Sequence, residues 1–322
     1  MAARAFVFPG QGSQCVGMGL ELAETFSAAR LVFEEVDEVL KQHLSHLMFE
    51  GPEMTLMLTE NAQPALMAVS MAVLRVLEDE GGLDLQQHAQ FVAGHSLGEY
   101  SALTAAKSFT LSDAVQLVKI RGKAMQKAVP AGLGAMAALL GLDLDRAREV
   151  AAQAAEGEVC TAANDNAPTQ VVVSGHMAAV QRAVALAAAY GAKRSAILPV
   201  SAPFHCELMR PAAETIAEAL AHITLEHPAV PLVANVTANC VEEPVTIRSL
   251  LVEQMTQTVR WRESVMYMHE QGVTQIVEVG VGKVLTGLTR RIARDLTGIA
   301  VHTPREIEAF LNSKNCCTVY TG

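Results

Sequence analysis

The sequence lacks the features of a membrane-spanning, secreted or nucleic-acid-binding chain. No uninterrupted apolar run reaches the roughly 18 residues that a membrane-spanning helix needs, although the mean hydropathy is +0.25. The N-terminal MAARAFVFPG has no basic region followed by a long apolar stretch, which a secretory signal requires. The 24 Lys and Arg are scattered through a chain of net charge -10. We therefore expect a soluble, cytoplasmic protein that binds neither nucleic acid nor a membrane.

Cysteine and glycine patterns that indicate disulfide, metal or phosphate sites are also missing. None of the six cysteines has CxxC spacing: Cys15, Cys160, Cys206, Cys240, Cys316 and Cys317. This pattern favours reduced thiols over a disulfide framework or a zinc site. The glycine-rich stretch from Gly10 to Gly12 is not followed by G-K-[ST], so a nucleotide-binding P-loop is excluded.

What the sequence does contain is typical of a large α/β domain. With 322 residues, 51% of them hydrophobic, the chain can bury a large core. Short apolar runs bounded by Gly or Pro predict strands at Ala5–Phe8, Phe91–Ala93, Leu232–Asn235 and Ile276–Val279. Amphipathic segments between them predict helices at Pro64–Glu80, Ser112–Lys127 and Pro211–His222. This alternation predicts a mainly parallel sheet covered by helices, in an α/β-hydrolase-like domain of residues 1–129 and 199–311.

The middle of the chain has a different order of elements. Strand-like and helical stretches follow as strand, helix, two strands, helix and strand: Ala135–Leu140, Asp143–Ala155, Val159–Ala162, Gln170–Val173, Met177–Tyr190 and Arg194–Leu198. This βαββαβ order predicts a small ferredoxin-like domain inserted at residues 130–198, between Pro130 and Pro199. Residues 312–322 break the preceding helical pattern and are expected to form a disordered tail.

A candidate nucleophile lies between a predicted strand and a predicted helix. The segment FVAGHSLGEY places Gly94, Ser96 and Gly98 as G-x-S-x-G directly after an apolar strand. In this context the motif is typical of a nucleophile elbow, where the serine hydroxyl is exposed at a helix N-terminus whose N–H groups stabilise an anion. The alternative interpretation is a glycine-flanked turn with a helix-capping serine.

A serine hydroxyl needs a base to accept its proton, and His205 is the leading candidate. His205 follows the last strand of the predicted insert, in a loop that should return to the carboxyl edge of the main sheet, where active sites are built. No aspartate between Ser96 and His205 lies in a suitable loop, so a backbone carbonyl could orient the imidazole instead.

These residues resemble the malonyl-CoA:acyl carrier protein transacylases of bacterial fatty acid synthesis, over about 310 of the 322 residues. The resemblance rests on several motifs in order: Phe8 to Gln14 (FPGQGSQ), Gly94 to Tyr100 (GHSLGEY), Arg121, Ala163-Asn164, Gln170 to Val172, Ser201 to His205, Gln254, Glu278 to Gly280 and Gly282 to Leu285. The chain departs from the family pattern at Met255 to Thr258, where an aromatic and Asn-Pro run is usual, and at Val281, where Pro is common.

The resemblance implies a role for each matching residue. Ser96 is then the nucleophile and His205 the base, and the main-chain carbonyl of Gln254 orients the imidazole. The N–H groups of Gln11 and Leu97 form the oxyanion hole.

Two further residues have a second interpretation. The resemblance implies that Arg121 binds the free carboxylate of the malonyl group, for which a planar guanidinium is well suited. The residues alone favour a solvated basic face, because Lys119, Lys123 and Lys127 lie on the same predicted helix. Phe204 is implied to exclude the extra methyl of methylmalonyl, and the alternative is simple core packing.

The expected reaction is a ping-pong transfer of malonyl from malonyl-CoA, through an ester on Ser96, to the phosphopantetheine thiol of holo acyl carrier protein. The resemblance thus implies an [acyl-carrier-protein] S-malonyltransferase, which we expect to be a monomer with no metal and no bound cofactor. Two alternatives remain: a serine hydrolase or thioesterase in which water replaces the thiol, and a scaffold that docks carrier proteins without turnover.

Overall fold

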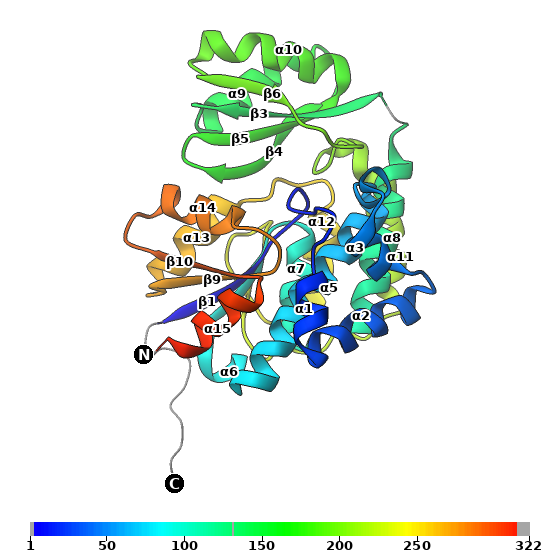
Figure 1. Cartoon of the computed structure of the whole chain (residues 1–322). Coiled ribbons are helices and arrows are strands. Elements are labelled where there is room, and N and C mark those ends of the chain that lie inside the picture. The colour runs from blue at the N-terminus through cyan, green and yellow to red at the C-terminus, as the bar shows by residue number, and fades with distance from the viewer. Residues whose placement is uncertain (1–2, 131, 314–322) are drawn as a thin grey trace.

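The computed structural model describes residues 3–130 and 132–313, which form two β-sheets with helices packed around them (Figure 1). The larger sheet has six strands in the order β10-β9-β1-β2-β7-β8. Its strands are β1 (Arg4–Phe8), β2 (Phe91–Gly94), β7 (Leu232–Val233), β8 (Cys240–Val241), β9 (Gln275–Val279) and β10 (Thr297–Val301). All neighbours pair in parallel except β7 and β8, which are antiparallel.

The two central strands bring the segments of the site together. All residues of β1 and β2 are buried, as expected of parallel strands covered on both faces. Their register pairs Phe8 with Gly94, the last residue of each strand. The loop after β1 and the turn after β2 therefore leave the same carboxyl edge of the sheet side by side, which is where open α/β sheets build their sites.

The helices of this part cover the sheet on both sides (Figure 1). The longest, α5 (Thr59–Gly81), is buried along most of its length and packs against α8 (Leu111–Ala128) and α2 (Ser27–Leu40). The others are α1 (Leu20–Thr25), α3 (Leu44–Glu50), α4 (Glu53–Leu56), α6 (Leu85–His88), α7 (Leu97–Ala105), α11 (Arg210–Ala221), α12 (Pro244–Glu253), α13 (Trp261–Glu270), α14 (Val284–Ile292) and α15 (Pro304–Asn312). No helix in the described ranges is both long and apolar enough to cross a membrane.

The smaller sheet is antiparallel and lies at the top of Figure 1. Its order is β4-β5-β3-β6, and its strands are β3 (Gly134–Leu140), β4 (Cys160–Ala167), β5 (Gln170–His176) and β6 (Arg194–Ile197). The helices α9 (Leu144–Ala155) and α10 (Met177–Ala187) pack on this sheet around their own apolar core.

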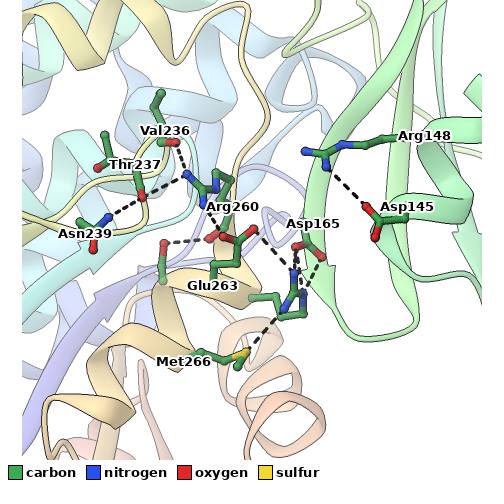
Figure 2. Close-up of polar contacts among 11 residues, drawn as sticks. Asp145, Arg148, Asp165, Val236, Thr237, Asn239, Arg260, Glu263 and Met266 are labelled. Atoms are coloured by element: carbon green, nitrogen blue, oxygen red, sulfur yellow. Dashed lines mark hydrogen bonds and ion pairs between the residues drawn. The ribbon is translucent and has the colours of Figure 1, made fainter. Parts of the chain in front are cut away.

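The edge strand β4 fastens the smaller sheet to the larger part of the chain. Asn164 forms a parallel bridge with Val259, whose N–H donates to the Ala163 carbonyl at 2.9 Å. The carboxylate of Asp165 pairs with Arg262 at the start of α13, with Nη2 2.8 Å from Oδ2. Figure 2 labels Asp165 together with Glu263, another residue of α13. The chain that leads from α12 to α13 is therefore held against the small sheet.

The sequence predicts a mainly parallel sheet with covering helices, and the structure confirms this coarse arrangement. Two strands of the large sheet were not anticipated: β10, which contains Gly298, and the two-residue β8, which is too short to give a pattern. The predicted helix at Pro64–Glu80 begins five residues earlier, at Thr59, so Pro64 lies inside the helix and not at its start. The predicted tail at 312–322 lies outside the described residues, except for Asn312, which ends α15, and Ser313.

Candidate functional site

Ser96 occupies the sharp turn between β2 and α7. Its backbone has φ 54 and ψ -107, a conformation that costs free energy for a residue other than glycine. The flanking glycines are required by close approach: a Cβ at Gly94 would overlap the Gly98 carbonyl, and a Cβ at Gly98 would overlap the Phe8 carbonyl. The turn thus presses α7 onto β1 and presents the serine hydroxyl beyond the sheet edge, as in a nucleophile elbow.

His205 lies against this hydroxyl. Its Nε2 is 2.8 Å from the Oγ of Ser96, and its Nδ1 is 2.8 Å from the main-chain oxygen of Gln254. Because a carbonyl oxygen can only accept, Nδ1 carries the proton and Nε2 offers its lone pair to the serine hydroxyl. Burial, and next the positive charge of Arg121, lower the pKa of His205 to about 3. The imidazole is therefore neutral, with an unprotonated Nε2 that faces the serine hydroxyl.

Arg121 reaches the same hydroxyl from α8. Its Nη2 donates to Ser96 Oγ at 3.0 Å and to Gln254 Oε1 at 2.8 Å, while Nη1 donates to Gln63 Oε1 at 2.8 Å. The side chain is 1% exposed, so its interpretation as part of a solvated basic face is wrong. No carboxylate of the described residues lies within 4.0 Å of the guanidinium, and its Nε has no hydrogen-bond partner there. Burial lowers the pKa of Arg121, and the nearby charge of Glu99 only partly opposes this. A buried cation with no carboxylate in direct contact is costly, and a ligand carboxylate would relieve that cost.

Gln11 and Leu97 each have a main-chain N–H group without an acceptor among the described residues. Leu97 is the first residue of α7, where helix N–H groups have no partner within the helix, and Gln11 follows β1. Within the described ranges, neither N–H donates to a backbone or side-chain acceptor. Both residues line the cavity that contains Ser96.

A cavity of about 330 Å³ joins these groups. Ser96, His205, Arg121, Gln11 and Leu97 all line it. The rest of the wall is largely apolar and includes Met57, Met125, Met136, Leu198, Val200 and Phe204. The residues from 3–130 and 132–313 contain no group of His, Cys, Asp and Glu side chains arranged to hold a metal ion.

Several polar residues of the site were not singled out from the sequence. Gln63, Asn235 and Glu99 bind the groups described above, and of these only Glu99 carries a local signal, because it follows the G-x-S-x-G motif directly. His95 lines the cavity as well, but its Nε2 is held 2.8 Å from Asn166 Oδ1 and not by the nucleophile. Glu99, Gln254 and Asn235 become a site only when the fold brings their segments together.

Comparison with known proteins gives a consistent result. Residues 5–303 match the model of the acyl transferase domain family. The malonyl CoA-acyl carrier protein transacylase of Escherichia coli is 48% identical over 307 residues, which are 95% of this chain and 98% of that protein. The crystal structure of the acyl-carrier-protein S-malonyltransferase of Bartonella henselae superposes with a TM-score of 0.94, at 54% identity, over 96% of this chain and 98% of that one.

A third similar structure contains a partner protein. It is a holo type II PKS acyl-carrier protein in complex with its malonyl-transacylase. The likeness to this chain has a TM-score of 0.93 at 43% identity and covers 96% of this chain and 99% of that one.

Proposed function

Because the chain belongs to the acyl transferase domain family, and within it to the malonyl CoA-acyl carrier protein transacylases, we propose that it loads acyl carrier protein with malonyl. The enzyme takes the malonyl group from malonyl-CoA and passes it to the carrier in fatty acid synthesis. Its partners are thus a coenzyme A thioester and the phosphopantetheine thiol of the holo carrier.

The reaction proceeds in two halves on Ser96. In the first, the serine oxygen bonds to the thioester carbon as its proton moves to Nε2 of His205, the carbon–sulfur bond breaks, and the CoA thiolate takes that proton. In the second, the carrier thiol gives its proton to His205 as its sulfur bonds to the ester carbon, the carbon–oxygen bond to Ser96 breaks, and His205 returns the proton to the serine oxygen. The Gln11 and Leu97 N–H groups stabilise the oxyanion of each tetrahedral intermediate.

One observation carries this proposal: a buried guanidinium without a carboxylate partner among the described residues lies 3.0 Å from an activated serine hydroxyl. A malonyl ester on Ser96 has a free carboxylate two carbons from the reacting carbonyl, within reach of Arg121. A plain hydrolase of unsubstituted esters has no use for this cation, and a non-catalytic scaffold has no use for a strained serine paired with a neutral imidazole.

The mass of the intact protein tests the proposal. Wild type mixed with malonyl-CoA should gain one malonyl group, and holo acyl carrier protein should remove it. Ser96→Ala should stay unmodified, while the matched control Ser101→Ala, a buried serine later on α7, should be acylated like wild type. Release of free malonate without carrier would indicate a hydrolase, and an unmodified wild type would indicate a scaffold.

We also propose that the smaller sheet and its helices form a ferredoxin-like domain of residues 130–198, inserted into an α/β-hydrolase-like domain of residues 1–129 and 199–311. The order β4-β5-β3-β6 supports this assignment, because β5 lies between the two strands of the unit β3-α9-β4. This is the split βαβ arrangement of that fold. We propose further that the enzyme works as a cytoplasmic monomer without a metal or a bound cofactor.

A further inference from the structure

Glu99 is a buried carboxyl group that has no part in the proton transfers described above. It lies on the first turn of α7 and is 1% exposed. Its Oε2 accepts the main-chain N–H of Asn235 at 3.0 Å and the side-chain Nε2 of Gln254 at 2.9 Å. Asn235 in turn accepts the N–H of Ser96 at 2.7 Å through its side-chain oxygen. Glu99 is thus bonded to two residues that hold the reacting groups.

The bond to Gln254 determines which way its side-chain amide faces. Nε2 of Gln254 donates both to Glu99 Oε2 and to the main-chain oxygen of Ser96, the latter at 3.0 Å. With its two N–H groups directed at these acceptors, the amide must turn its oxygen away from them, toward Nη2 of Arg121 at 2.8 Å. A flipped amide would bring oxygen against oxygen at both positions and would present N–H groups to a guanidinium, which only donates.

The orientation of the Gln254 amide therefore affects Arg121, the cation proposed to bind the malonyl carboxylate. Nη2 of Arg121 is shared between Gln254 Oε1 and Ser96 Oγ, and the guanidinium carbon lies 5.5 Å from the centre of the Tyr100 ring. The Tyr100 ring limits where the guanidinium can lie, while Gln254 Oε1 and Ser96 Oγ fix the direction of Nη2. Without a correctly turned Gln254 amide, Nη2 loses one of its two acceptors, and the guanidinium is held only by Gln63 through Nη1 and by Ser96 through Nη2.

We propose that Glu99 is a positioning residue for Arg121, acting through the side-chain amide of Gln254, and that it thereby sets the preference for acyl groups with a free carboxylate. The inference rests on the proposed malonyl transfer. An acetyl group has no carboxylate, so its transfer depends much less on the direction of Nη2. Loss of Glu99 should therefore lower malonyl transfer more than acetyl transfer, whereas a general structural defect would lower both alike.

The role of Glu99 does not require a charge. Burial raises its pKa to about 7, against the opposing effects of Gln254, Asn235 and Arg121. The carboxyl group is thus partly protonated at neutral pH, and an uncharged form still has an oxygen that accepts from Gln254. A glutamine at this position keeps that acceptor oxygen and should replace Glu99, whereas an alanine or a methionine should not.

The test compares single-turnover acylation of Ser96 by malonyl-CoA and by acetyl-CoA in wild type, Glu99→Ala, Glu99→Met and Glu99→Gln. We expect the malonyl-to-acetyl ratio of kcat/KM to fall on the order of tenfold in the Ala and Met variants, as for one lost hydrogen bond to a charged group. In the Gln variant the ratio should stay within about threefold of wild type. Both substrates are measured on one preparation, so the ratio is independent of the folded fraction.

The matched control is Glu278→Gln. Glu278 is another buried glutamate, and it accepts the N–H groups of Leu285 and Thr286 at the start of α14. Its substitution should lower the Tm and leave the ratio unchanged. An unchanged ratio in both Glu99→Ala and Glu99→Met would overturn the inference, and so would a Gln variant as impaired as these two. A wild type that forms no malonyl ester would instead refute the proposed function.

Discussion

The Nη2 atom of Arg121 lies 3.0 Å from the Oγ of Ser96, so the cation and the nucleophile share one end of the cavity. Arg121→Ala should lower kcat/KM for malonyl-CoA by about 100- to 10,000-fold, because two charge-assisted hydrogen bonds of roughly 1.5 to 3 kcal/mol each are lost. Acetyl transfer should change by less than about fivefold, since acetyl has no carboxylate to bind. Single-turnover kinetics with the two thioesters measure both effects.

The control for this prediction is Lys123→Ala, which removes an exposed cation from the same helix. It should leave both rates unchanged. Equal losses of malonyl and acetyl transfer in Arg121→Ala would show that the guanidinium supports the site in general and does not select the substrate.

Phe204 is a buried ring that lines the cavity directly before His205. If it excludes the methyl branch of methylmalonyl, Phe204→Ala should improve the kcat/KM of methylmalonyl-CoA relative to malonyl-CoA by about 10- to 100-fold, which corresponds to about 1 to 3 kcal/mol for one methyl group. Competition between the two thioesters for Ser96 measures this ratio. If this ratio stayed at the wild-type value, Phe204 would contribute only to core packing and not to substrate selection.

The low pKa of His205, about 3, predicts an unusual pH profile. The imidazole must be neutral to accept the serine proton, and an ordinary histidine becomes protonated near pH 6.5. His205 should remain neutral well below that pH, because burial and Arg121 disfavour its charged form. We expect the single-turnover rate with acetyl-CoA to change by less than about twofold between pH 8 and pH 5.5. Half-maximal activity near pH 6.5 would contradict this assignment.

The sequence predicted the strand, turn and helix around Ser96 well because the whole signal is local. An apolar strand, two glycines and a helix within ten residues define the turn at Ser96, and the structure has these elements there. Gln63 and Asn235 carry no such signal, because neither belongs to a local motif that marks it as part of a site. Gln63 contacts Arg121, from which it is separated by 58 residues in the sequence, and Asn235 contacts Ser96, from which it is separated by 139 residues.

The environment of Arg121 could have been predicted more closely from helix geometry. Lys119 and Lys123 each lie two positions away, which on an α-helix places them on the opposite side from Arg121. The residues that share its face are three and four positions away, and Leu117, Val118 and Met125 are all buried. The charge run on α8 is thus one partly solvated face, and the arginine belongs to the apolar face.

Gly98 and Gly287 both lie in helices but should respond oppositely to alanine. A Cβ at Gly98 would overlap the Phe8 carbonyl, which accepts the N–H of His95 at 3.0 Å, so Gly98→Ala must move the elbow away from β1. We expect a loss of about 3 kcal/mol or more in the free energy of unfolding, together with slower acylation of Ser96. A Cβ at Gly287 on α14 would meet no neighbouring group of the described residues within 4 Å, so alanine there should stabilise by about 0.5 to 1 kcal/mol.

Urea denaturation of the two variants measures these changes. If Gly98→Ala unfolded at the same urea concentration as wild type and kept its rate of acylation, the close approach of α7 to β1 would not be needed for the site.

Substitution of Arg262 should cost more unfolding free energy than substitution of Asp165, although the two residues form one ion pair. The Asp165 side chain is 1% exposed and that of Arg262 is 24% exposed. Arg262→Met leaves a buried carboxylate without its cation and should cost about 3 kcal/mol of unfolding free energy. Asp165→Asn leaves a cation that reaches solvent and Glu263, at 3.6 Å, and should cost about 1 kcal/mol.

The double variant decides whether the two residues act as one pair. The variant that combines Asp165→Asn with Arg262→Met should be more stable than Arg262→Met alone. Arg262→Met leaves the Asp165 carboxylate without a partner, and Asp165→Asn removes that charge. The double variant should also acylate Ser96 more slowly than wild type, since β4 holds the chain at Val259 that follows the carbonyl of Gln254. Equal costs for the two single changes, measured in urea, would show that solvent reaches Asp165 and that the pair does not fasten β4 to α13.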